Sequence, residues 1–244
     1  EYMTAVRLFF DWYRKRSDFT TNPARAVDTD WIDKKEPKHS KPNLNTEEMR
    51  ALIESTTSMR AKAMISLMAS TGIRAKECCQ AKMENLDLEE RQLVVDTVKT
   101  DYGERTVYFD LRTKRVLKKY ISDGYRQKYA STNDEYLFLS YNKNQHKEHQ
   151  HVSTDRLRDD FLTAVENCEK IQDQVEQEEM EDGRERSTIG THILRLSFSQ
   201  HWIDNGCDLL SLKNHQGWET LETATQYLSD DVARETRDRY GLSL

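Results

Sequence analysis

The 244-residue chain is long enough to bury the core of one large domain, or of one domain with a small companion. It is 36% hydrophobic and 33% charged, and no stretch approaches the ~20 apolar residues of a membrane helix, so we expect a soluble protein. Eight Gly and three Pro exclude a collagen-like or low-complexity chain. The net charge is −6, but eight acidic and three basic residues between Glu169 and Arg186 supply most of it, so the rest of the chain can still form a local basic face.

The first predicted element is an amphipathic helix over residues 5–16, whose apolar side chains recur at helical spacing. Asn22-Pro23 is expected to end this element, because the residue before a proline avoids the helical region. Residues 28–44 are polar, contain two of the three prolines and show no hydrophobic period, which predicts a linker. Because the chain begins with Glu1 rather than Met, we expect its true N-terminus to lie upstream.

A second body is predicted from residue 45 onward. Asn45 followed by Glu48 indicates an N-cap with a capping box, and it opens a helix with one apolar face. A further helical pattern covers residues 64–68 and stops near Thr71-Gly72. The pattern restarts over residues 75–80, so we expect two helices separated by a sharp turn.

Residues 93–95 and 106–109 have strand composition, and a turn-like Asp101-Tyr102-Gly103 lies between them, which predicts an antiparallel hairpin. The acidic stretch from Glu169 to Arg186 is expected to be a solvated helix or loop. The other predicted elements are a short apolar strand over 136–139 and helices over 111–127, 152–168, 192–205, 208–214, 222–228 and 230–240. The predicted fold class is therefore α+β, mainly α-helical with a small antiparallel sheet.

The residues with the most chemical information lie in the last third of the chain. His192 and Arg195 are three residues apart, on one face of a predicted helix. Trp218 follows Gln216-Gly217, and Tyr227 comes nine residues after Trp218. Each of these residues alone can be explained as an ordinary core or surface residue. Only their order and spacing together indicate a functional site.

Three upstream residues complete the set. Arg74 ends the segment Thr71-Gly72-Ile73-Arg74 at a predicted helix start, and Glu77 follows one helical turn later. Lys99 lies at the predicted hairpin, where lysines are common for structural reasons alone. Arg105 lies within the predicted hairpin and Lys114 a few positions after it, and both are alternatives to Lys99 as the basic residue of this set.

This order of residues resembles the tyrosine recombinase (phage integrase) family over about residues 45–230. The family pattern is Arg, Lys on a β-hairpin, His-x-x-Arg, His or Trp, and Tyr nine residues further on. Most members have His at the position of Trp218. A Trp at this position resembles the Cre-like and Flp-like members. The resemblance implies the tyrosine recombinase catalytic fold, which breaks and rejoins DNA. It also implies that residues 1–27 are the C-terminal end of a truncated helical core-binding domain, that 28–44 are a linker, and that 45–244 form the catalytic domain.

The resemblance implies a role for each residue, and the chemistry is consistent with it. Tyr227 would attack a DNA phosphate and form a covalent 3′-phosphotyrosine, a reaction for which neither a cofactor nor a metal is expected. Arg74 and Arg195 would pair with the nonbridging oxygens, where charge accumulates. The remaining expected roles are Lys99 as proton donor to the leaving oxygen, His192 as base or phosphate donor, Trp218 as an N–H donor to phosphate, and Glu77 as the residue that holds Arg74.

The expected partner is double-stranded DNA carrying target sites, bound by a homo-oligomer that is a tetramer on DNA and can be a monomer in solution. We expect a cytoplasmic enzyme at a prokaryotic or archaeal nucleoid, encoded by the host or a mobile element, that integrates, excises or resolves DNA. Two other functions are compatible with parts of the pattern. One is DNA relaxation by a type IB topoisomerase, and the other is DNA binding without catalysis.

Overall fold

The structure is a computed structural model. It describes residues 2–16, 21–27, 43–96, 103–129, 135–140, 151–175, 177–179, 185–187 and 189–221. The chain divides into two compact units, Glu1–Lys41 and Pro42–Leu244. Across the described ranges, every helix is too short or too polar to cross a membrane.

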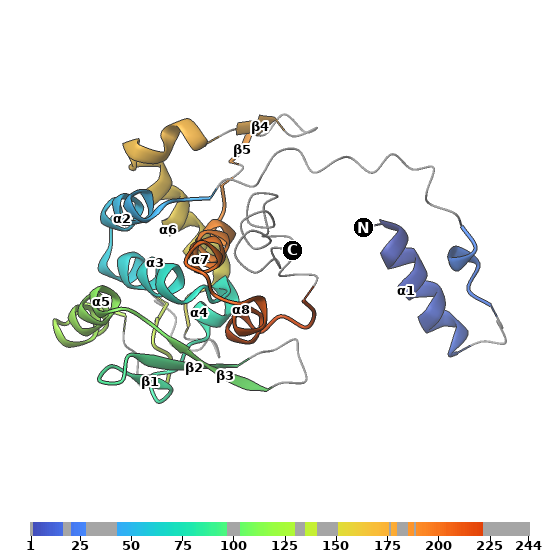
Figure 1. Ribbon diagram of the computed structural model, residues 1–244, viewed down its shortest axis with the longest axis horizontal. Coiled ribbons are helices and arrows are strands. Elements are labelled where there is room, and N and C mark those ends of the chain that lie inside the picture. The colour runs from blue at the N-terminus through green and yellow to red at the C-terminus, as the bar shows by residue number, and fades with distance from the viewer. Residues whose placement is uncertain are drawn as a thin grey trace, which may run out of the picture. The chain divides into compact units, whose positions relative to one another are not determined.

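The first unit contains helix α1 (Tyr2–Arg14) and the 3₁₀ helix η1 (Pro23–Arg25), in blue in Figure 1. The predicted amphipathic helix is confirmed, but the prediction that Asn22-Pro23 ends it is wrong, because α1 ends at Arg14. Asn22 instead caps η1, with its Oδ1 accepting the Ala24 N–H at 3.0 Å. The cause is that a proline at the first helical position needs no N–H partner, so Asn-Pro starts a helix as readily as it stops one.

The second unit is mainly helical, with a small sheet at one edge (Figure 1). This confirms the predicted fold class. Its helices are α2 (Thr46–Glu54), α3 (Met59–Thr71), α4 (Ala75–Cys79), α5 (Leu111–Ser122), α6 (Thr154–Glu166), α7 (His192–Asp204) and α8 (Leu209–Gln216), with the 3₁₀ helix η2 (Glu169–Gln174). Its strands are β1 (Leu86–Asp87), β2 (Gln92–Asp96), β3 (Glu104–Tyr108), β4 (Gln177–Glu179) and β5 (Glu185–Ser187).

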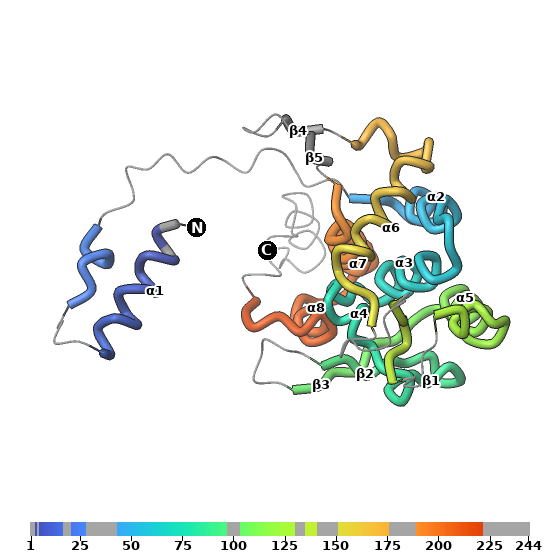
Figure 2. Tube along the Cα trace, turned by 180° about the vertical axis from the view of Figure 1, so that it is seen from behind, coloured from blue at the N-terminus to red at the C-terminus, as the bar shows by residue number. Residues whose placement is uncertain are grey.

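Helix α3 is the central element of this unit. It is buried at nine of its 13 positions, since it is apolar on most sides rather than along one stripe. Helices α2, α4, α5, α6 and α7 and strand β3 all pack against it. Seen from behind, α6 runs across the helical layer beside α3 and α4 (Figure 2). The C-terminal end of α3 is therefore held firmly by the core.

The three-stranded sheet is antiparallel, in the order β1-β2-β3, and β1 was not predicted from the sequence. In the β2–β3 register Leu93 pairs with Val107 and Val95 with Arg105. Alternate residues of a strand point to the same face, so Arg105 shares the inner face with the buried Val107. The hairpin thus directs a cation toward the core rather than toward solvent.

Local signals account for most of the confirmed element boundaries. Asn45 and Glu48 form the predicted capping box, with Asn45 Oδ1 accepting the Glu47 and Glu48 N–H groups. Gly72, in the left-handed conformation, ends α3 where the sequence predicted.

Three predicted segments differ from the structure. The helix expected over 111–127 ends at Ser122, shortly before Gly124. The φ of Gly124 is +81°, which is incompatible with a right-handed helix. Residues 136–139 form only isolated bridges rather than a strand, because the Arg126 guanidinium binds the carbonyls of Tyr136 and Leu137 at 2.7 and 3.2 Å. In the acidic stretch, η2 is followed by the paired strands β4 and β5, where a helix or loop was expected. Residues 28–42 of the predicted linker, the turn residues 101–102 and the two helices predicted after residue 221 lie outside the described residues.

Candidate active site

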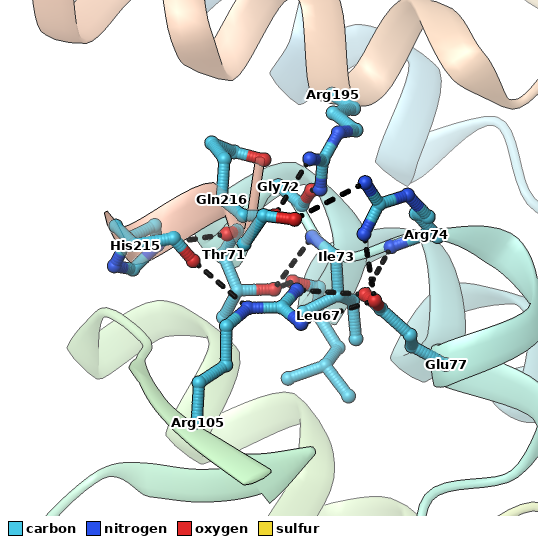
Figure 3. A network of polar contacts seen from close by, with 11 residues as sticks. Leu67, Thr71, Gly72, Ile73, Arg74, Glu77, Arg105, Arg195, His215 and Gln216 are labelled. Atoms are coloured by element: carbon cyan, nitrogen blue, oxygen red, sulfur yellow. Dashed lines mark hydrogen bonds and ion pairs between the residues drawn. The ribbon is translucent and has the colours of Figure 1, made fainter. Parts of the chain in front are cut away.

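Arg74 lies where the chain leaves α3 and enters α4. Gly72 turns the chain with a φ of +66°, and Arg74 occupies the N-cap position of α4. The Arg74 backbone N–H donates to Glu77 Oε2 at 2.8 Å, and its Nη1 donates to Glu77 Oε1 at 3.0 Å (Figure 3). Its side chain is 42% exposed. The contact expected between Glu77 and Arg74 is therefore present, and it leaves much of the guanidinium accessible.

Glu77 binds a second arginine from the hairpin. Arg105 donates from Nη1 to Glu77 Oε1 at 3.0 Å and from Nη2 to Oε2 at 2.8 Å, a bidentate pair. Burial by itself would raise the pKa of Glu77. The hydrogen bonds and charge of Arg105, with smaller contributions from Arg74, outweigh burial and lower that pKa. Glu77 is thus a buried anion that joins α4 to β3 and orients both guanidiniums.

Arg195 comes from the first turn of α7 and is almost fully buried, with 2% of its surface exposed. Its Nη1 donates to the Gly72 carbonyl and its Nη2 to the Gln216 carbonyl, both at 2.7 Å. A buried cation is tolerated here because it sits at the C-terminal ends of α3 and α8, where carbonyls lack helical partners and the helix dipoles are negative. Arg195 therefore joins two turns that are far apart in the chain.

The end of α8 forms the second half of the site. Gly217 adopts a φ of +62°, which ends the helix and turns the chain toward Trp218. The Gly217 carbonyl lies 3.5 Å from Arg74 Nη2, and the His215 carbonyl accepts from Arg105 Nε at 2.9 Å. Side chains from α4, α7 and β3 thus converge on the last residues of α8 (Figure 3).

Trp218 packs directly behind this turn. It is 6% exposed, and the centre of its ring lies 5.5 Å from Arg195 Cζ, a cation–π distance. Its ring also belongs to a small apolar cluster with Ile203 and Leu212. The structure therefore brings together four of the predicted site residues: Arg74, Glu77, Arg195 and Trp218.

The other predicted site residues are His192, Lys99 and Tyr227. His192 is the first residue of α7, one turn before Arg195, and is exposed. Lys99 and Tyr227 lie outside the described residues. Lys114, an alternative to Lys99, binds Glu89 at 2.8 Å on the outer surface of α5. Across the described ranges no group of three or more His, Cys, Asp or Glu residues is arranged to hold a metal ion.

Sequence reasoning missed two residues of this network. Arg105 was considered only as an alternative to Lys99, whereas it anchors Glu77 and the end of α8. The strand alternation that puts Arg105 on the same face as Val107 could have indicated this. His215, whose ring contacts Thr71, carried no signal, because nothing in the sequence places these two residues together.

Comparison with known proteins agrees with this architecture. The sequence model of the phage integrase family matches residues 42–234. A tyrosine recombinase XerC of Thermodesulfovibrio yellowstonii is 28% identical over 240 residues, covering 94% of this chain and 70% of the relative. A tyrosine recombinase XerD of Listeria innocua is 24% identical over 235 residues, covering 93% and 69%.

Solved structures share the fold. The XerA recombinase superposes with a TM-score of 0.61 at 25% identity, over 85% of this chain and 68% of that one. The Tn1549 transposon integrase, solved with transposon right end DNA, superposes with a TM-score of 0.70 at 15% identity, over 98% and 78%, which shows likeness of fold alone. The chain belongs to the phage integrase family and is a tyrosine-type site-specific DNA recombinase. The resemblance and the fold expected from the sequence are thus confirmed.

Proposed function

We propose that this recombinase cleaves and rejoins duplex DNA through a 3′-phosphotyrosine on Tyr227, with Arg74 and Arg195 as the main stabilisers of the transition state. The observation that carries the proposal is that both guanidiniums lie at the turn after α8, where Arg195 Nη2 donates to the Gln216 carbonyl and Arg74 Nη2 lies 3.5 Å from the Gly217 carbonyl. Two cations held in one place match a phosphodiester undergoing substitution, since its charge builds up on nonbridging oxygens. Carbonyl and carboxylate partners hold both guanidiniums in position before DNA arrives.

The covalent step needs no net input of energy. The Tyr227 oxygen attacks phosphorus, the bond from phosphorus to the 5′ oxygen breaks, and a 5′-hydroxyl leaves. The reverse attack by a 5′-hydroxyl restores the phosphodiester and releases Tyr227. An ordinary tyrosine has a pKa of about 10, so Tyr227 needs a base and a positive field to react. In this proposal His192 accepts its proton or donates to the phosphate, and the arginines supply the field.

The remaining roles concern proton transfer and orientation. Lys99, between β2 and β3 in the chain, donates the proton that the leaving 5′ oxygen requires. Trp218 donates its indole N–H to a phosphate oxygen and stacks on Arg195, a contact supported by the 5.5 Å ring distance. Glu77 keeps Arg74 oriented through its bond of 3.0 Å.

The proposal includes an assembly. The chain acts as a tetramer on two DNA sites and exchanges strands in two steps, in the DNA of a prokaryotic host or of a mobile element. Residues 1–27 are the end of a core-binding domain, 28–44 a linker and 45–244 the catalytic domain. A Tn1549 integrase and a XerH recombinase of similar fold were solved in complexes with DNA, which supports DNA as the partner.

The decisive test is Tyr227→Phe. The probe is a nicked duplex whose sequence is chosen by recovering covalent adducts of the unmodified chain from a random duplex pool. We expect the unmodified chain to form the adduct and Tyr227→Phe to form none while binding the same DNA equally well. Adduct at the unmodified level would remove Tyr227 as the nucleophile. Supercoiled plasmid without the selected site separates recombinase from topoisomerase, because only a topoisomerase would relax it fully.

Lys99 can be tested through the leaving group. A bridging 5′-phosphorothiolate leaves as a thiolate, which needs little protonation. Lys99→Ala should therefore cleave natural DNA slowly and the sulfur-substituted DNA at nearly the normal rate. Arg74→Ala should be slow on both substrates, because it acts on nonbridging oxygens. Lys114→Ala, which breaks only the surface pair with Glu89, is the matched control and should cleave both normally. Equal slowing of Lys99→Ala on both substrates would place the acid elsewhere.

A further inference from the structure

His215 lies in the last turn of α8 and makes contacts in three directions. Its Nε2 lies 3.0 Å from the Thr71 carbonyl at the end of α3. Its ring stacks on Phe198, with centroids 5.2 Å apart, and packs against Trp202 at a tilt of 36°, with centroids 4.5 Å apart. Its own carbonyl accepts a hydrogen bond from Arg105 Nε at 2.9 Å. One residue thus connects α8 with α3, α7 and β3.

The hydrogen bond to the Thr71 carbonyl determines which nitrogen of the His215 imidazole carries the hydrogen. A carbonyl can only accept, so His215 Nε2 carries the hydrogen and donates it. The Thr71 carbonyl is among the last four of α3, which have no helical N–H partner, so His215 satisfies a group that would otherwise be left unpaired. Thr71 precedes Gly72 by one residue and Arg74 by three, which places this bond at the base of the Arg74 loop (Figure 3).

The charges around His215 favour its neutral form. Burial lowers the pKa of His215 most, and the neighbouring guanidiniums of Arg105 on β3 and Arg195 on α7 lower it further. The Thr71 carbonyl opposes this effect. Near neutral pH the ring is therefore an uncharged donor that packs between cations without adding to their repulsion.

We propose that His215 is a positioning residue for strand cleavage, which fastens the turn carrying Trp218 against the loop carrying Arg74. The inference rests on the proposed active site. Arg195 joins the same two turns through backbone carbonyls, whereas His215 joins them through a side-chain donor and an aromatic stack. The backbone N–H of Trp218 donates to the Lys213 carbonyl at 3.1 Å. The position of the turn that His215 holds therefore also determines the position of the Trp218 backbone.

Two substitutions separate the parts of this contact. His215→Phe keeps an aromatic ring on Phe198 and Trp202 but removes the donor to Thr71. His215→Gln keeps a nitrogen donor at the same number of bonds from Cβ but removes the ring. We expect His215→Phe to slow single-turnover adduct formation by about ten- to a hundredfold, because small displacements of positioned groups have effects of this size. His215→Gln should recover most of that loss, and both variants should bind the selected duplex as tightly as the unmodified chain.

A second measurement needs no DNA. Amide hydrogen exchange in residues 209–221 should rise several-fold in His215→Phe and less in His215→Gln, while exchange in α6 stays unchanged. Val165→Ala, a change in the buried core at the end of α6 beside η2, controls for general loss of stability and should not slow cleavage of folded protein. Unchanged exchange in residues 209–221, or cleavage by His215→Phe at the unmodified rate, would overturn the role of His215. Failure of the unmodified chain to form any adduct would instead refute the proposed function itself.

Discussion

Helices α3 and α8 meet at the candidate active site, and both end in a glycine in the left-handed conformation, yet they are held by different means. The end of α3 belongs to the core: nine of its 13 residues are buried, and Thr71 Oγ1 donates to the Leu67 carbonyl at 2.6 Å. Only two residues of the eight in α8 are buried. Its end is held chiefly by hydrogen bonds from Arg195 and Arg105, which lie on other elements, and by the ring of its own His215, which binds the Thr71 carbonyl.

This difference shows which half of the site can be altered without unfolding the molecule. The α3 end is fixed by apolar burial spread over many residues, so it tolerates the loss of any single polar contact. The α8 end depends on a few hydrogen bonds, each contributing about 1 kcal/mol, or more where the donor is charged. Changes to those side chains should therefore act on Trp218 and the residues that follow it before they act on the fold.

The largest effect is expected from Arg195→Ala, which removes a side chain that donates to both turns, at the Gly72 and Gln216 carbonyls. Cleavage should fall by about 10²-fold or more through loss of a charge-stabilising donor. Unfolding free energy should fall by about 3 kcal/mol, because the Gly72 and Gln216 carbonyls stay buried without this donor. Single-turnover adduct formation and urea denaturation measure the two effects. Arg195→Lys should remain impaired, since an ammonium lacks the planar fork that reaches two carbonyls. Unchanged stability in Arg195→Ala would show that the turns are not joined through this residue.

Gly72→Ala tests how closely the two ends approach each other. A Cβ at Gly72 would lie 2.3 Å from Gln216 Nε2 and 2.6 Å from Phe198 Cδ1. The matched control is Gly103→Ala, where φ is +63° against +66° at Gly72 but no atom lies within 4 Å of the added carbon. Both variants should carry backbone strain of about 1 kcal/mol, and Gly72→Ala should lose about 2 kcal/mol more through steric overlap. Equal thermal stability of the two variants would mean that the α8 end moves aside freely.

The smallest of the three effects is expected from Glu77→Gln, which weakens the anion joining Arg74 and Arg105. The variant should be less stable by about 2 kcal/mol at neutral pH, because the charge-assisted bonds become neutral ones. The folded-state pKa of Glu77 is lowered from its usual 4.5, so its stabilisation is complete above that value and is lost as pH falls through the folded-state pKa. The stability difference between the two proteins should therefore shrink in acid. Urea titrations from pH 7 to pH 3 measure it, and a difference independent of pH would contradict the ionised role of Glu77.

Much of the secondary structure was predictable because its signals are local. The capping box of Asn45 and Glu48 and the end of α3 at Gly72 depend on residues within a few positions of one another, and the β2–β3 hairpin pairs strands that follow each other directly in the chain. Two of the errors also have local causes, since Asn22-Pro23 starts η1 and Gly124 follows the early end of α5. A third error concerns residues 136–139, which have strand composition. Arg126, 10 and 11 residues earlier, donates to the Tyr136 and Leu137 carbonyls, and no pattern in the sequence indicates that contact.

The sequence by itself determined the family, because the order and spacing of Arg74, His192, Arg195, Trp218 and Tyr227 can be read directly from the chain. It also determined where α3 stops and α4 begins, since a left-handed glycine and an N-cap act within one turn. Only the tertiary structure decided that Arg195 is buried, that Arg105 anchors Glu77, and that His215 reaches Thr71. The physical reason is that these contacts end on backbone carbonyls or cross long stretches of chain, 123 residues for Arg195 and Gly72 and 144 for His215 and Thr71. Every residue has a backbone carbonyl, so no residue type in the sequence identifies the carbonyl to which an arginine or histidine donates in the folded protein.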